Sequence, residues 1–252
     1  MNTGPREWDA ETYDAVSDPQ FQWGMEVLER LELRGDESAL DAGCGSGRVT
    51  EQLLERLPGG RLTAVDGSEA MIAKAKERLG EGATYVVSDL SELSLPEPVD
   101  LIFSTATFHW IPDHERLFAR LRENLVPGGR LVAQCGGEGN VAEHAKAIAA
   151  VATRPEYLPH FDGMTAMWNF APPEPTEERL RAAGFSVARC WLEPKPYTPV
   201  EPLRFTMTVT LGPHLARLPE ELRQPFAEDV LALCSRPLTL DYVRLNIEAV
   251  AG

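Results

Sequence analysis

The most specific chemical signal in the chain is a glycine-rich segment, where residues 41–47 read Asp-Ala-Gly-Cys-Gly-Ser-Gly between a β-rich run and an amphipathic helix. Glycines permit positive φ and let a ligand approach the backbone closely, and the helix that follows offers unpaired N–H donors. A dinucleotide-binding fingerprint would need a third glycine at position 48, where this chain has Arg48. The spacing therefore argues against a dehydrogenase.

Other side chains suited to chemistry follow later strands. Asp66 ends the β-rich run 61–66, and a carboxylate there can accept hydrogen bonds from two neighbouring donors of a ligand. Asp66 could alternatively serve only as a helix cap or as a solvated strand end. The same alternative holds for Asp41 in the glycine-rich segment and for Asp89, which follows the run 84–87. His109 follows the fourth run, and its imidazole could act as a general base for a hydroxyl or an amine. It could equally form a pocket wall or simply pack in the core.

Alternating elements must position these residues. The periodicity predicts strands at 38–42, 61–66, 84–87, 99–104 and 130–134, separated by helices, one capped by Ser68 and one following Asp113. Strands separated by helices imply a doubly wound α/β core with a parallel sheet. Beyond it we predict a helix over 141–152, a helix starting at Thr176, and strands at 188–192 and 238–249. The last of these alternates like a half-exposed edge strand.

Four motifs in register resemble the class I S-adenosylmethionine-dependent methyltransferases. They are the glycine segment, Asp66 with Met71, Asp89 with Leu90, and the turn at 127–129 that leads into the fifth strand. The resemblance implies S-adenosylmethionine as cofactor, S-adenosylhomocysteine as product, and a Rossmann-like, mostly parallel sheet of seven strands. It also implies that the cofactor contacts Tyr13, Gln22, Trp23, Asp41, Gly43, Cys44, Gly45, Gly47, Asp66, Gly67, Met71, Ser88, Asp89, Leu90, Ser104, Thr105 and Phe108.

The same resemblance divides the chain into four parts. Residues 1–37 would form an N-terminal helical lid, and residues 38–136 the cofactor-binding core. Residues 137–175 would be a cap insertion after strand five, and residues 176–252 would complete the sheet and the cap. The aromatic lid arm would close over the methionine half of the cofactor, although its aromatic side chains could instead hold a helix to the core.

The pair His109-Trp110 is similar to one in small-molecule methyltransferases of the trans-aconitate 2-methyltransferase type. We expect Trp8, His109, Trp110 and Trp168 to contact the acceptor. A carboxylate acceptor would need no base, because it is already ionised at neutral pH. Where those relatives carry an Arg-x-Arg-Pro stretch, this chain has Gln-Phe-Gln-Trp at 20–23, which argues against a polyanionic acceptor.

The formal charge of −15 disfavours nucleic acids and anionic membranes as partners. Nearly half of that excess lies in residues 1–38, with 10 acidic and 3 basic side chains. No apolar run is long enough to span a membrane, and no signal peptide is evident, which indicates a cytoplasmic protein. The cysteine spacing suggests no metal site.

We therefore expect a monomeric or homodimeric enzyme that methylates a small molecule, most simply at a carboxylate or hydroxyl oxygen. The alternatives are a cofactor-binding module without transferase activity and a methyltransferase acting on nitrogen or carbon of a small metabolite. A protein or RNA substrate is disfavoured, because no basic groove is evident.

Overall fold

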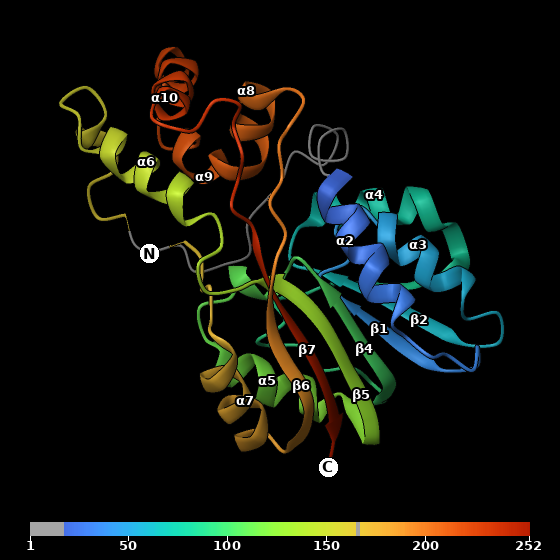
Figure 1. The fold of residues 1–252 in the computed structure, drawn as a ribbon. Helices are drawn as coiled ribbons and strands as arrows, with labels where there is room; N and C mark the ends of the chain where they lie inside the picture. The colour runs from blue at the N-terminus through green and yellow to red at the C-terminus, as the bar shows by residue number, and fades with distance from the viewer. Residues whose placement is uncertain (1–17, 165–166) are drawn as a thin grey trace.

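In the computed structural model, which describes residues 18–164 and 167–252, a seven-stranded sheet has the order β3-β2-β1-β4-β5-β7-β6 (Figure 1). The first five strands in this order are parallel, whereas β7 is antiparallel to both of its neighbours. This confirms the doubly wound, mostly parallel α/β fold. The strands are β1 (Ser38–Ala42), β2 (Arg61–Asp66), β3 (Thr84–Val87), β4 (Val99–Thr105), β5 (Leu125–Gly136), β6 (Phe185–Pro194) and β7 (Val243–Ala251).

Helices cover both faces of the sheet (Figure 1). Successive residues of β4 point to opposite faces, so Leu101 and Phe103 pack against α2 and α3 while Ile102 packs against α5 and α7. Ser68 caps α4 and Asp113 caps α5 through their side chains, as the sequence predicts for Ser68. The helices are α2 (Asp18–Glu29), α3 (Arg48–Glu55), α4 (Glu69–Leu79), α5 (His114–Glu123) and α7 (Pro173–Ala182).

The prediction of an edge strand at 238–249 is wrong, because β7 lies inside the sheet between β5 and β6. Two of its three alternating polar residues are buried, Arg244 at 2% and Asn246 at 0% exposure, and the third, Glu248, is half-buried. Asn246 accepts hydrogen bonds from Gln134 and Arg30, so the face that reads as solvent-exposed is covered by polar partners. Residues 238–242 precede the strand, and Leu240 forms an isolated bridge there.

Helix α7 begins three residues earlier than predicted, at Pro173 rather than at Thr176. Prolines fit the first turn of a helix, because its N–H groups have no intrahelical partner. Thr176 is therefore an internal residue, and its Oγ1 donates to the Pro172 carbonyl at 2.7 Å. The turn predicted at 127–129 is likewise absorbed into β5, opposite a register shift in β4.

A helical cap stands beyond the edge of the sheet where β5 ends and β7 begins (Figure 1). It has its own apolar core, which includes Tyr157, Leu211 and Phe226. A second cluster joins the cap to α2 and β7 through Trp23 and Tyr242. Among the described residues, no helix is both long and apolar enough to cross a membrane. The cap contains α6 (Ala142–Ala152), α8 (Pro202–Phe205), a π-helical turn (Thr206–Thr210), α9 (Gly212–Leu215) and α10 (Glu220–Ala232).

Replacing Asn124 with Ala should destabilise the fold by about 2–3 kcal/mol, because buried polar groups would lose their partners. Asn124 accepts from the Leu95 N–H and donates to the carbonyls of Leu93 and Arg120, at 2.7–3.1 Å. Urea unfolding would measure the change. Gln224→Ala, on an exposed helix face, is the control and should change stability by less than about 0.5 kcal/mol. Equal effects of the two substitutions would contradict the prediction.

Candidate functional site

The glycine loop between β1 and α3 turns on three left-handed residues, Gly43, Gly45 and Gly47, with φ of +87°, +54° and +85°. A Cβ on Gly43 would lie 2.1 Å from Oγ1 of Thr107, so the segment after β4 packs directly on the loop. A Cβ on Gly45 would meet nothing within 4 Å. The loop is thus tightly packed on one side and leaves a cradle at Gly45 that any side chain would fill.

Asp66 connects this loop to the start of α4. Its carboxylate accepts the N–H of Gly45 at 3.0 Å and the N–H of Ser68 at 2.9 Å. These two bonds hold the carboxylate at the carboxyl end of β2, beside the glycine loop. Asp66 is therefore both a structural link and a candidate ligand-binding group at the end of β2.

Asp41 is buried below the loop rather than opening into it. It is 2% exposed, and Thr50 Oγ1 donates to its Oδ2 at 2.7 Å. Burial raises the pKa of Asp41 to about 7, and the negative charge of Asp66 adds to the rise. Cys44 is also buried, packing against Ile72 and Ala75. Neither side chain is solvent-accessible enough to be the first contact of an incoming ligand.

Asp89, one of the residues expected to contact the cofactor, follows Ser88, whose N–H donates to the Asp66 carbonyl at 3.0 Å. Asp89 is half-buried, and its Oδ1 accepts the Ser91 N–H at 2.8 Å. Three further predicted residues surround this strand edge. They are Gly67, which is half-buried, and Met71 and Leu90, which are buried. The structure thus brings the predicted cofactor residues that follow β2 and β3 to one edge of the sheet.

The residues at the end of β4 and just after it differ in how they are buried. Ser104 Oγ donates to the Ala42 carbonyl at 2.6 Å and so ties β4 to β1. Phe108 is 1% exposed, and its ring packs against Phe118 in the core, which gives that side chain a structural role. Thr105, by contrast, is half-buried beside α2.

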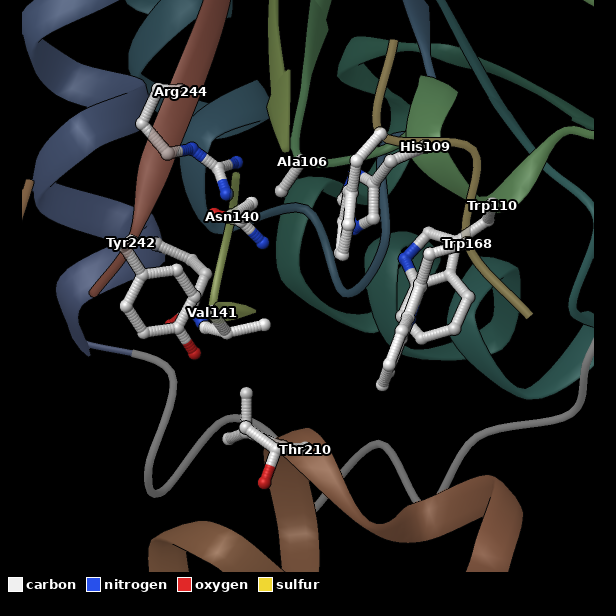
Figure 2. Close-up of a pocket in the computed structure, with 12 residues that line it drawn as sticks. Ala106, His109, Trp110, Asn140, Val141, Trp168, Thr210, Tyr242 and Arg244 are labelled. Atoms are coloured by element: carbon white, nitrogen blue, oxygen red, sulfur yellow. The ribbon is translucent and has the colours of Figure 1, made fainter. Parts of the chain in front are cut away.

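A pocket that is partly open to solvent, with about 500 Å³ of empty space including that open part, lies between this edge of the sheet and the cap. Figure 2 shows Arg244, Asn140 and Tyr242 on one side of it and His109, Trp110 and Trp168 on the other. Three of the four residues predicted to contact the acceptor therefore share one pocket. Its lining consists of Gln20, Ala106, His109, Trp110, Asn140, Val141, Trp168, Phe170, Val209, Thr210, Tyr242 and Arg244.

His109 is held in one protonation state. The Gly136 N–H donates to its Nδ1 at 3.2 Å, which requires a lone pair on that nitrogen. Burial lowers the pKa of His109 well below its usual range, and the positive charge of Arg244 lowers it further. The neutral ring therefore carries its proton on Nε2. In this state His109 donates a hydrogen bond and has no lone pair on Nε2 with which to act as a general base.

Of the residues predicted to form the lid, Gln22 and Trp23 lie in the described part of the chain. Trp8 and Tyr13 lie outside the described residues. On α2, Gln22 is exposed, whereas Trp23 is 7% exposed and packs against Tyr242 with ring centroids 5.0 Å apart. The Arg244 guanidinium lies 5.1 Å from the centre of the Trp23 ring. Trp23 thus supports the wall that carries Arg244.

The sequence analysis did not identify the polar side of the pocket, which is formed by Arg244, Asn140 and Tyr242. Asn140 follows β5, and its Oδ1 accepts the Val243 N–H at 2.9 Å, which fixes the start of β7. Arg244 lies opposite Gly136 in the β5–β7 register. The rule that ligands bind beyond the carboxyl ends of parallel strands would have pointed to Asn140. Nothing in the alternating pattern of 243–249 singled out Arg244.

Comparison with known proteins gives a consistent result. Residues 40–133 match the family model of a methyltransferase domain. A trans-aconitate 2-methyltransferase from Methylobacterium nodulans is 31% identical over 186 residues, covering 74% of this chain and 67% of that protein. One from Rhizobium etli is 28% identical over 97% of this chain and 99% of that protein. The match to one from Acidovorax ebreus, 38% identical, spans about half of each chain, 51% of this one and 49% of that one.

Solved structures agree on the fold. A phosphoethanolamine N-methyltransferase from Haemonchus contortus, solved with phosphomonomethylethanolamine and S-adenosylhomocysteine, superposes with a TM-score of 0.61. It is 21% identical and covers 96% of this chain and 56% of its own, so it supports the architecture alone. From the sequence relatives, the family model and this fold together, the chain belongs to the class I S-adenosylmethionine-dependent methyltransferases and resembles the trans-aconitate 2-methyltransferases among them.

Proposed function

We propose that this protein transfers a methyl group from S-adenosylmethionine to a carboxylate oxygen of a small molecule. The observation that carries the proposal is a pocket in which a neutral, hydrogen-bond-donating His109 faces a buried Arg244 next to the glycine loop. Both groups favour an anionic acceptor. A hydroxyl or amine acceptor would need a base, and His109 is in the wrong state to provide one.

The chain's own residues fit the cofactor. The cradle at Gly45 leaves room for a ligand against the backbone, and Asp66 is fixed where it can accept the ribose hydroxyls. Asp89 with Leu90 and Met71 would hold the adenine, and the loop around Gly43 the methionine end. When bound, S-adenosylmethionine supplies the methyl group of its sulfonium, so the bond to the acceptor oxygen forms as the methyl–sulfur bond breaks.

The protein's contribution is then alignment and exclusion of water. A carboxylic acid has a reference pKa near 4, so its oxygen is already a nucleophile at neutral pH and no proton has to move. The aromatic side chains Trp110, Trp168 and Phe170 keep the pocket apolar on one side. His109 and Arg244 orient the carboxylate, and alignment of the reacting groups can supply a large part of a rate enhancement.

The alternatives make different demands on the pocket. A cofactor-binding module without activity would bind S-adenosylhomocysteine and methylate nothing. Methyl transfer to nitrogen of a small metabolite would require a group that accepts a proton near neutral pH. A screen of metabolite acids and amines, with S-adenosylmethionine labelled on its methyl group, separates these cases by the chemical class of the labelled product.

Substituting Asp66 by Ala should weaken binding of S-adenosylhomocysteine by about 10- to 100-fold, the cost of losing a charge-assisted hydrogen bond. Isothermal titration calorimetry on the full chain would measure the dissociation constant. Glu115→Ala, which removes an exposed carboxylate from α5, is the matched control and should leave the affinity unchanged. Wild-type protein that does not bind at millimolar ligand, or unaltered binding after Asp66→Ala, would refute the assigned cofactor site.

For His109 we expect the substitutions to Gln and Phe to differ. Gln retains an N–H donor, so His109→Gln should keep kcat within about tenfold of the wild type, whereas His109→Phe should lose roughly 10- to 100-fold. Initial rates of labelled methyl transfer to the best carboxylic acid from the screen would measure both. A general base would instead cost about 10²–10⁴ in either variant. Equal and large losses would therefore show that His109 accepts a proton.

A further inference from the structure

We infer that the acceptor is a monocarboxylic acid with a flat, apolar body, and that Arg244 selects its charge while the aromatic wall of Trp110, Trp168 and Phe170 selects its shape. This inference rests on the proposed methyltransferase function and goes further by naming the class of acceptor. It departs from the tricarboxylate that appears in the names of the relatives.

The first step concerns charge. Among the described residues that line the pocket, Arg244 is the one with a formal positive charge, because His109 is neutral. Its side chain is 2% exposed, and a charge interacts more strongly where water is excluded. A guanidinium matches a single carboxylate in charge and in planar, two-pronged geometry.

Further carboxylates would find no equivalent partner among the described lining residues. They would meet only neutral side chains there, either apolar ones such as Val141 and Val209 or uncharged polar ones such as Asn140, and burying an ionised carboxylate without a charged partner is unfavourable. The sequence points the same way, because residues 20–23 are Gln-Phe-Gln-Trp, and Gln20 brings a neutral side chain to the pocket.

The second step concerns shape. Trp168 and Phe170 are stacked, with ring centroids 5.5 Å apart and planes inclined by 14°. Trp110 meets Trp168 edge-on at 6.0 Å, and His109 lies 5.8 Å from Phe170. The three residues of the aromatic wall, Trp110, Trp168 and Phe170, are half-buried rather than fully enclosed, so part of their ring surface faces the pocket. Offset and edge-to-face contacts between rings favour a flat partner over a branched, hydrated one.

The two walls face each other, as Figure 2 shows, with Ala106 between Arg244 and His109 and with Thr210 at the opposite end. Ala106 precedes Thr107, which packs on the glycine loop. A carboxylate between Arg244 and His109 therefore lies at the cofactor side of the pocket, and the apolar body extends along the aromatic wall toward the cap. Methylation turns this anion into a neutral ester, which loses its attraction to Arg244 and is released more readily.

The test uses three probes titrated into the full chain saturated with S-adenosylhomocysteine. They are trans-cinnamate, its uncharged counterpart cinnamamide, and the tricarboxylate trans-aconitate. We expect trans-cinnamate to bind at least about tenfold more tightly than either of the others, because each lacks one of the two features. Cinnamamide binding as tightly, tighter binding of trans-aconitate, or no binding of trans-cinnamate at millimolar concentration would each overturn the inference.

Variants separate the two walls. Arg244→Gln should weaken trans-cinnamate at least about tenfold while leaving affinity for S-adenosylhomocysteine within about twofold, and Arg244→Lys should restore part of the loss. Trp168→Ala should weaken trans-cinnamate more than acetate, which has no body to stack. Unchanged binding in either Arg244→Gln or Trp168→Ala would contradict the role given to that residue.

The cofactor measurement distinguishes the two possible failures. If the wild type does not bind S-adenosylhomocysteine, the proposed function itself fails. If it binds S-adenosylhomocysteine but prefers trans-aconitate, the function stands and the acceptor class is wrong. Should Arg244→Gln lose S-adenosylhomocysteine binding through misfolding, Arg244→Lys and Trp168→Ala still decide the outcome.

Discussion

The arrangement of the site depends on how Asp66 fixes the glycine loop. Three left-handed residues in five positions give the chain between β1 and α3 a path that favours glycine at each of them. Asp66 supports this path from the end of the neighbouring strand by accepting N–H groups on both sides, from Gly45 and from Ser68. The loop, the start of α4 and the edge of β2 are therefore held as one unit.

The pocket proposed for the acceptor has a different origin, because separate parts of the chain meet there. The segment after β4 contributes His109 and Trp110, which the parallel sheet places at its carboxyl edge. The cap contributes Thr210 and the aromatic pair Trp168 and Phe170. Arg244 enters from β7, whose antiparallel direction brings the start of that strand to the same edge. A reversed final strand thus adds a cation where parallel strands alone would bring only their carboxyl ends.

The sequence was sufficient to predict the parallel core, the glycine loop and the cap of α4 by Ser68, because these depend on local periodicity and on residues a few positions apart. It was insufficient for β7. Alternation of Val243, Leu245 and Ile247 with polar residues reports that the two faces differ, but it does not report what covers the polar face. Here Arg30 and Gln134, far away in sequence, cover it by bonding to Asn246. The tautomer of His109 was equally hidden, since it is set by the backbone of Gly136.

Most of the pocket's lining lies outside the 40–133 segment that matches the methyltransferase domain. Val141, Phe170, Val209 and Arg244 all come from the cap or from the last strand, and none of them is a member of the glycine loop or its supports. Substitution in these parts is therefore expected to change the proposed acceptor preference without disturbing the residues proposed to hold the cofactor. The residues proposed to hold the cofactor and most of those proposed to select the acceptor thus lie in different parts of the chain, so redesign of acceptor preference can begin from the cap and β7.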